Sequence, residues 1–439
     1  MRKTLLSIAL LAAAWEAGAA NLSEIYQMAR KQDAQYASAQ AAYQAGLEVL
    51  PQGRAGLLPS LNLSANLRHI NSDTDAGSRD YSSRGATLAL TQPLFRKQNL
   101  TQYDQAKLQA QAVEAQWKAA EQDLILRVAK AYFDVLLAQD NVATAEAQKA
   151  AIGEQLALAK KSFEVGAATI VDTHEAQARY DATEAELIAA RNTLEVARRA
   201  LERLIMTEAP ALARLSESAR ISLPEPADMA AWGKQAREGS LAVAIQQAQA
   251  EIARREIDKQ RSGYLPTLDL AASYSDTRNG SVGGVAGVDS QSATIGLELG
   301  WNLFQGGATD SLVRQAVANK ERALFDLENA MRQAELDSRQ AYLGVVSGEA
   351  RVRALGQAVV SNEAQLRSTK LGREVGVRTA VDVLNAQQSL FSAQRDLAAA
   401  RYQALQSGLQ LKAVVGGLGE ADLKAIDALL VEPSPPAGK

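Results

Sequence analysis

The chain has 439 residues, a net charge of −3 at pH 7 and no cysteine. The near balance of acidic and basic residues argues against nucleic acid as a partner, and the absence of cysteine excludes disulfides, thiolate metal sites and lipid attachment through a cysteine. Apolar residues make up 47% of the sequence but aromatic residues only 5%. Abundant alanine accounts for the difference, and this composition favours long, closely packed helices over a compact globular core.

Residues 1–20 have the pattern of a secretory signal peptide. Arg2 and Lys3 provide the positive end, residues 4–14 the apolar run, and Gly18-Ala19-Ala20 the small residues of a cleavage site. A membrane anchor is the alternative, but the apolar run is too short to cross about 30 Å of hydrocarbon. We therefore expect an exported chain that is cut after residue 20. No long apolar stretch follows, so insertion into a membrane would depend on strands.

The rest of the chain carries one unit twice. From about Gln105 to Ile205, the second copy lies 210 residues downstream of the first without a gap. The residues that recur at this spacing are Ala131-Tyr132 as Ala341-Tyr342, Glu164-Val165-Gly166 as Glu374-Val375-Gly376, Val171-Asp172 as Val381-Asp382, and Ala176-Gln177 as Ala386-Gln387. We assign repeat 1 to residues 21–205 and repeat 2 to residues 229–415. A linker over 206–228 joins them, a segment with a short tail over 416–439 follows, and the repeat predicts two equivalent supersecondary units.

Each repeat contains a predicted helix followed by a β-hairpin, over residues 61–92 in the first copy and 268–301 in the second. Polar or glycine-rich loops are expected within them, over 71–83 and 279–291. Apolar and polar residues alternate in the strands: Leu61, Leu63 and Leu67 alternate with Asn62, Ser64 and Asn66, and Ile295, Leu297 and Leu299 alternate with Gly296, Glu298 and Gly300. Each hairpin is therefore predicted to have one apolar face.

A sheet packed on a globular core is one explanation of these hairpins, but the helices that follow are far too long to cover a small sheet. Strands of about ten residues with one apolar face match an outer-membrane barrel instead. Four strands cannot close such a barrel, because the smallest membrane barrels have about eight. Oligomerisation is therefore expected: two chains would give a filled barrel, and three would give one with room for a pore.

Two long helical hairpins are predicted over residues 97–205 and 310–415. In the first, apolar residues recur about every 3.6 positions from Val113 to Val142, which predicts a nearly straight helix and not a tight coiled coil. A glycine turn ends the outgoing helix of each hairpin, and the returning helix begins just before Asp172 or Asp382. An aspartate in the first turn interacts well with the positive end of a helix, so capping is one explanation of both aspartates.

Together, the signal peptide, the two strand pairs, the two helical hairpins and the sequences at their tips resemble the TolC family of outer-membrane efflux and secretion channels. The motifs that carry this resemblance are Leu57-Leu58-Pro59-Ser60-Leu61, Leu265-Pro266-Thr267-Leu268-Asp269-Leu270, Ala131-Tyr132-Phe133, the two Val-Gly tips and Val381-Asp382-Val383-Leu384-Asn385-Ala386-Gln387. The resemblance implies a mainly α fold with β. It implies a homotrimer in which a twelve-stranded outer-membrane β-barrel is continued by a twelve-helix periplasmic α-barrel, with the segments 206–228 and 416–439 in an equatorial belt.

The implied function is that of an exit duct in a tripartite efflux pump or a type I secretion system, exporting drugs, other small molecules or proteins across the periplasm and outer membrane. The implied partners are a periplasmic adaptor, an inner-membrane ABC or RND transporter and the outer-membrane lipid of a Gram-negative cell. A non-conducting periplasmic coiled-coil adaptor or scaffold is the alternative. No catalytic motif occurs, and His69 and His174 lack companion ligands at metal spacing, so we expect no enzyme activity, cofactor or metal site.

The resemblance also implies a gate at the periplasmic end, closed by bonds between helical hairpins of one chain and its neighbour. By motif position, the closing aspartate and arginine fall on Asp172 and Arg378, and the aspartate of a cation-attracting ring falls on Asp382. Two positions depart from the family pattern: Arg373 replaces a tyrosine of the closing network, and Asn385 replaces an acidic pore residue. The alternative is that Asp172 is only a helix cap and Arg378 only a solvated charge.

The tips themselves are candidate docking points for the hairpin of a periplasmic adaptor. The residues concerned are Val165 and Gly166 in the first copy and Val375 and Gly376 in the second. The alternative is that glycine merely closes each turn, because glycine adopts the left-handed conformation that ends many helices.

Overall fold

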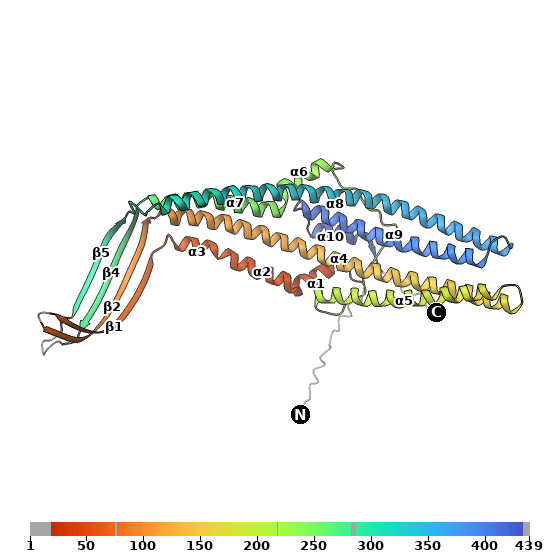
Figure 1. The fold of residues 1–439 in the computed structure, drawn as a ribbon, viewed down its shortest axis with the longest axis horizontal. Helices are drawn as coiled ribbons and strands as arrows, with labels where there is room; N and C mark the ends of the chain where they lie inside the picture. The colour runs from red at the N-terminus through yellow and green to blue at the C-terminus, as the bar shows by residue number, and fades with distance from the viewer. Residues whose placement is uncertain (1–18, 75–76, 217, 282–286, 433–439) are drawn as a thin grey trace, which may run out of the picture. The chain divides into compact units, whose positions relative to one another are not determined.

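The computed structural model describes residues 19–74, 77–216, 218–281 and 287–432, and it is mainly helical with a β-sheet, as predicted (Figure 1). Nearly all of the predicted signal peptide and the Pro-rich end of the C-terminal tail lie outside these residues. The chain forms two compact units. The strand unit comprises Gln40–Trp117 and Leu241–Arg332, and the helical unit comprises Met1–Ala39, Lys118–Ser240 and Gln333–Lys439.

The strand unit contains a four-stranded antiparallel sheet in the order β1-β2-β4-β5. Its strands are β1 (Ser60–Thr74), β2 (Gly77–Phe95), β4 (Thr267–Asn279) and β5 (Ser290–Gly300). Each repeat contributes one hairpin, and the two hairpins join through β2 and β4. Within the described residues, β1 and β5 each have a strand neighbour on one side only.

The first β-hairpin is longer than the sequence suggested, and the prediction of a loop over residues 71–83 is wrong. Pairing continues through this segment, from Arg68 opposite Ser83 to Asp73 opposite Ser78. The residues here are mostly polar, so there is no alternation for a sequence pattern to detect. Backbone hydrogen bonding still extends the ladder, because strand pairing depends on main-chain groups and not on an apolar face.

The strand register separates an apolar from a polar face of the sheet. Leu61 lies opposite Leu90, and Leu63 opposite Leu88, which places these side chains on one face. Leu63 and Leu297 of this face are 74% and 65% exposed, so the described parts of the strand unit leave the face uncovered. The opposite face carries polar contacts. The Thr87 hydroxyl there donates to Ser275 Oγ at 3.2 Å.

The predicted helical hairpins consist of α4 (Lys97–Glu164) with α5 (Ile170–Ile205) and of α8 (Ala308–Glu374) with α9 (Ala380–Val414). Figure 1 shows each pair reversing direction at a short turn. No helix in the described ranges has the length and apolar character that crossing a membrane requires.

Shorter elements flank these hairpins in both repeats. Those of repeat 1 are α1 (Leu22–Gln32), α2 (Ala34–Leu47) and α3 (Val49–Ala55), and those before the second sheet hairpin are α6 (Met229–Gly239), α7 (Leu241–Arg261) and the 3₁₀ turn η1 (Ser262–Tyr264). The linker and the C-terminal segment meet in the helical unit, where β3 (Arg214–Leu215) pairs with β6 (Leu430–Val431). Between α9 and β6 lies α10 (Glu420–Asp427), whose Asp427 carboxylate accepts from the Leu22 N–H at 2.9 Å.

Candidate functional site

The two hairpin tips have the same backbone, which explains their glycines. Gly166 and Gly376 adopt left-handed φ angles of 75° and 80°, a conformation that strains other residues. In the first tip the Gly166 N–H donates to Phe163 O at 2.9 Å and the Ala167 N–H to Ser162 O at 2.8 Å. The second tip repeats this Schellman pattern, from Gly376 to Arg373 at 3.0 Å and from Val377 to Gly372 at 2.8 Å.

Valine side chains surround both glycines and point to solvent within the single chain. Val165 is 75% exposed and Val375 is 66% exposed. Val171 and Val377, which flank the same turns, are similarly exposed. Each tip thus combines a rigid turn with a small apolar surface, which is suited to packing against another protein.

Asp172 and Asp382 are the third residues of capping boxes at the starts of α5 and α9. The Thr169 N–H donates to Asp172 Oδ2 at 3.0 Å, and the Asp172 N–H donates back to Thr169 Oγ1 at 3.3 Å. Thr379 and Asp382 exchange the same bonds at 2.9 and 3.1 Å. Capping is therefore one role of both carboxylates.

These bonds also keep the two carboxylates ionised. The side-chain and backbone hydrogen bonds of Thr169, and then the charge of Arg373, lower the pKa of Asp172. The backbone and side-chain bonds of Thr379, and then the charge of Arg378, lower the pKa of Asp382. Each tip therefore presents a fixed negative charge beside an arginine.

Asp172 and Arg378 do not form an ion pair with each other within one chain, among the residues that the structure describes. The Arg378 N–H donates to Gly372 O at 3.1 Å, and its Cγ lies 2.8 Å from where a Cβ of residue 372 would stand. The arginine stem thus packs on the turn, and no carboxylate of the described residues pairs with its guanidinium. The bond implied by the resemblance would join neighbouring chains, and it stays a prediction.

Arg373 has a partner that the sequence did not reveal. Its Nη1 donates to Gln155 Oε1, which links α8 of one hairpin to α4 of the other. Gln155 lies among Ile152, Leu156 and Ala159, which form a buried cluster with Ala176 and Leu384. In the sequence, Gln155 is recognisable only as a polar residue beside an apolar stripe. That pattern does not indicate that Arg373 is its partner.

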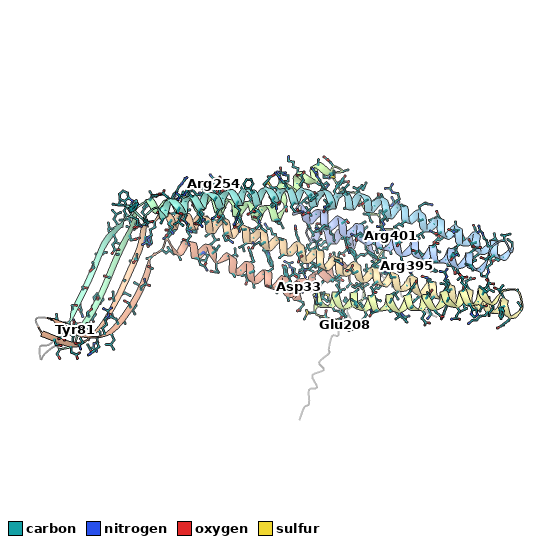
Figure 2. The ribbon with its side chains drawn as sticks, in the orientation of Figure 1. Asp33, Tyr81, Glu208, Arg254, Arg395 and Arg401 are labelled. Atoms are coloured by element: carbon teal, nitrogen blue, oxygen red, sulfur yellow. The ribbon has the colours of Figure 1, made fainter. Side chains whose placement is uncertain are left out.

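A second polar layer lies behind the tips and ties α9 to the first hairpin. Arg179 of α5 donates to Asn385 Oδ1 at 3.2 Å. Asn385, which stands where the family pattern has an acidic residue, is thus a neutral hydrogen-bond acceptor within the chain. Gln148 donates to Gln388 at 2.9 Å. Arg395, labelled in Figure 2, donates to Gln148 at 3.4 Å and lies 3.6 Å from the Glu186 carboxylate. The sequence alone does not reveal these partners because they pair residues from different repeats.

A partly buried carboxylate lies farther along α4. The Tyr402 hydroxyl of α9 donates to Asp140 Oδ2 at 2.7 Å. Burial raises the pKa of Asp140, although the Tyr402 bond and the charges of Arg214 and Arg401 lower it. This contact is another link between the hairpins. No group of three metal-ligating side chains occurs in the ranges that the structure covers.

Comparison with known proteins gives the family. The model of the family described as "Outer membrane efflux protein" matches residues 25–205 and 232–417, once on each repeat. The outer membrane protein TolC of Vibrio cholerae is 35% identical over 93% of this chain and 94% of its own length. The alkaline protease secretion protein AprF of Pseudomonas aeruginosa is 34% identical over 96% of this chain and 90% of its own.

Structural comparison gives the same fold. The crystal structure of the outer membrane protein VceC of Vibrio cholerae superposes with a TM-score of 0.76 at 21% identity, over 90% of this chain and 96% of that one. The family model and the two sequence relatives confirm the resemblance inferred from the motifs and the expectation of a channel protein instead of an enzyme or a non-conducting scaffold. The chain belongs to the outer membrane efflux protein family.

Proposed function

We propose that three copies of this outer-membrane efflux channel protein assemble into one continuous exit duct. The observation that carries the trimer is the four-stranded sheet, whose edge strands have one described neighbour each and whose leucine face is uncovered. Backbone groups at a sheet edge must be paired inside a bilayer, and four strands are too few to close on themselves. Three sheets joined edge to edge give a twelve-stranded barrel with leucines toward lipid and a polar lumen.

In this proposal the repeats 21–205 and 229–415 are equivalent units, so three chains supply six helical hairpins to a periplasmic tunnel. The segments 206–228 and 416–439 form its equatorial belt. Support comes from the pairing of β3 with β6, which joins these two segments. Crosslinking of the detergent-solubilised protein should stop at three chains, and the purified protein should conduct ions across a planar bilayer. A monomer found in the soluble periplasmic fraction would contradict the duct.

The duct is gated at the tips. Asp172 bonds to Arg378 of a neighbouring chain, Asp382 forms a cation-attracting ring, and Arg373 and Asn385 hold the two hairpins of one chain together. The capping boxes support this gate because they fix both carboxylates in the ionised state beside arginines. An exposed pair is worth only about 0.2–1 kcal/mol, so a partner protein can break each bond while threefold symmetry adds three of them.

The opening partner is a periplasmic adaptor that docks on Val165, Gly166, Val375 and Gly376, and it connects the duct to an inner-membrane ABC or RND transporter. The exposed valines beside two rigid turns support this surface. Relatives named for protease secretion and for efflux point to proteins or small molecules as the exported cargo. The chain has no cysteine, so a single cysteine at Val165 or Val375 gives a clean site for crosslinking to a candidate adaptor. A cysteine at exposed Val196, on α5 away from the tips, is the control.

A further inference from the structure

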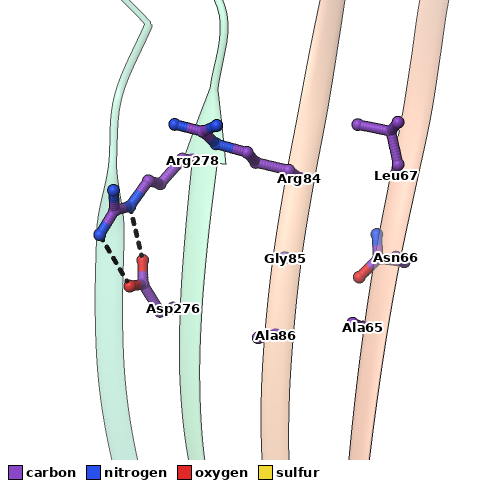
Figure 3. A pocket seen from close by; sticks show the side chains of 8 residues that line it. All are labelled: Ala65, Asn66, Leu67, Arg84, Gly85, Ala86, Asp276 and Arg278. Atoms are coloured by element: carbon purple, nitrogen blue, oxygen red, sulfur yellow. Dashed lines mark hydrogen bonds and ion pairs between the residues drawn. The ribbon is translucent and has the colours of Figure 1, made fainter.

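The apolar face of the sheet ends in a row of charged side chains. On β2, Leu90, Leu88 and Ala86 are followed on the same face by Arg84, and on β4 the residue opposite Arg84 is Arg278. Strand pairing places residues that lie opposite each other on the same face, so both arginines belong to the leucine face. Figure 3 shows them on β2 and β4, close to the point where β4 ends, with Leu67 of β1 beside them.

The two arginines differ in their partners. Arg278 binds the Asp276 carboxylate, with Nη2 3.3 Å from Oδ2 and Nε 3.5 Å from Oδ1. No carboxylate pairs with Arg84 in the part of the chain described, although Asp289 lies near both arginines. Another acid of this end, Asp80, is 3.0 Å from His69 Nε2. Arg84 therefore retains its charge and its donors next to a second guanidinium.

An open cavity of about 480 Å³ adjoins this pair on the sheet. It is lined by Ala65, Leu67 and Ala86 together with Arg84, Asp276 and Arg278. A guanidinium presents parallel N–H donors that match a phosphate, and a phosphate between two arginines also relieves their repulsion. Leucines that continue from the arginines along the face match an acyl chain and not water.

We propose that Arg84 and Arg278 bind the phosphate of an outer-leaflet membrane lipid, whose acyl chains lie along the leucine face. This inference rests on the proposed function, because the apolar face must meet lipid for the ligand to be in reach. The lipid, and not free phosphate, is the ligand because apolar surface and guanidinium donors are contiguous. The site anchors the barrel at a fixed depth in the outer leaflet.

The test uses delipidated, detergent-purified protein and two probes, bisphosphorylated lipid A and the same lipid with both phosphates removed. Bound lipid is counted by native mass spectrometry. We expect Arg84→Gln to weaken binding of the phosphorylated probe about tenfold, and Asp276→Asn to strengthen it by releasing Arg278. The matched control is Arg68→Gln, because Arg68 lies opposite Ser83 on the other face of the same sheet.

Equal binding by Arg84→Gln and Arg68→Gln, or equal binding of both lipids by the unaltered protein, would overturn the site. Displacement of the lipid by millimolar inorganic phosphate alone would show a simple anion site and would overturn the lipid as its ligand. Planar-bilayer conductance of the same preparations distinguishes a wrong lipid site from a wrong assignment as a trimeric channel. A conducting trimer without phosphate selectivity contradicts only the lipid site, and a protein that neither conducts nor forms trimers contradicts both.

Discussion

Asp172 and Asp382 occupy the same position in the two hairpins. A helix cap needs only an oxygen of the side chain as hydrogen-bond acceptor, whereas the proposed gate needs its negative charge. Asp172→Asn keeps an oxygen for the Thr169 N–H but loses the negative charge. Asp172→Ala also loses that oxygen, which is one half of the capping box, while the Thr169 hydroxyl still accepts from the N–H of residue 172. If the charge bonds to Arg378 of a neighbouring chain, both variants raise single-channel conductance. Arg378→Ala should match them, and the double variant should add little because the same bond is already lost.

Controls at the same scale come from neighbouring residues. Arg373→Ala should open the channel less than Arg378→Ala and more at low salt, because its charge acts on Asp172 from within the chain. Asp382→Asn should weaken cation selectivity without raising conductance.

The lowered pKa keeps Asp172 ionised as the pH falls toward the usual aspartate range, so closure should persist at about pH 5. Unchanged conductance in Asp172→Asn and Arg378→Ala would assign both residues to the turn alone.

The contacts of Ala20, near the start of the described residues, indicate where the signal peptide is cleaved. The Ala20 N–H donates to Ala211 O at 2.7 Å, and the Ala20 carbonyl accepts from the Ala213 N–H at 3.0 Å. The hydroxyl of the fully buried Tyr132 lies 3.1 Å from the same carbonyl. Tyr132 also bonds to Ala213 O at 2.8 Å and would keep that partner, but cleavage after residue 20 would leave the N–H of the buried Ala213 without its acceptor, which is unfavourable.

We therefore expect cleavage one residue earlier, between Ala19 and Ala20. Ala17 and Ala19 then provide the small residues that signal peptidase requires. The mature protein should begin with Ala20-Asn21-Leu22, which N-terminal sequencing or intact mass determines directly. A mature chain that begins at Asn21 would restore the boundary that the sequence pattern suggested.

At the scale of elements, the sheet is the part that a single substitution probes best. Leu297 and Glu298 are neighbours on β5 with opposite orientations, because Leu297 faces Leu270 and Glu298 faces Asp269 across the ladder. Leu297→Arg should destabilise the inserted barrel by roughly 2–4 kcal/mol if it lies near the middle of the bilayer. Glu298→Arg, on the polar face, is the control and should leave heat stability of the trimer in detergent nearly unchanged. Equal tolerance of both would reverse the assignment of the faces.

The contact between α4 and α9 gives a pH-dependent expectation. Because burial raises the pKa of Asp140, the folded chain holds this proton more tightly than the unfolded chain. The ionised carboxylate therefore reduces stability above the folded pKa, and the penalty disappears below the unfolded value. Asp140→Asn, which can still accept from Tyr402, should raise the unfolding temperature more at about pH 8 than at about pH 4. Calorimetry that shows the same shift at both pH values would contradict this account.

The same elements show what a sequence can reveal. The helical hairpins were predictable because an apolar stripe and a Gly turn recur in both repeats, and those signals are local. The paired segment over residues 71–83 was not, because its side chains carry no alternation. The tip aspartates were found by motif, but the partners Gln155, Arg179 and Arg395 depend on how one repeat packs on the other. Such contacts between distant segments leave no periodic trace in either segment.

At the scale of the whole molecule, the proposed gate opens when the two hairpins of a chain separate at their tips. Arg373 and Gln155 join α8 to α4 across that boundary, so we expect their replacement by cysteines to raise conductance. These would be the only thiols in a chain that has none of its own. A short bifunctional thiol reagent that spans them should then return conductance to the closed level, because a covalent link replaces the lost bond.

A matched pair tests whether separation of the hairpins is the motion involved. Lys149 Nζ lies 2.8 Å from the Glu184 carboxylate, and this contact joins α4 to α5 within one hairpin. Cysteines at these two positions, crosslinked by the same reagent, should leave opening unaffected if each hairpin moves as one body in the proposed gate. Full conductance after crosslinking at 155 and 373 would instead mean that the two hairpins of a chain move together. The gate would then lie only between neighbouring chains, where Asp172 and Arg378 would hold it without help from Arg373.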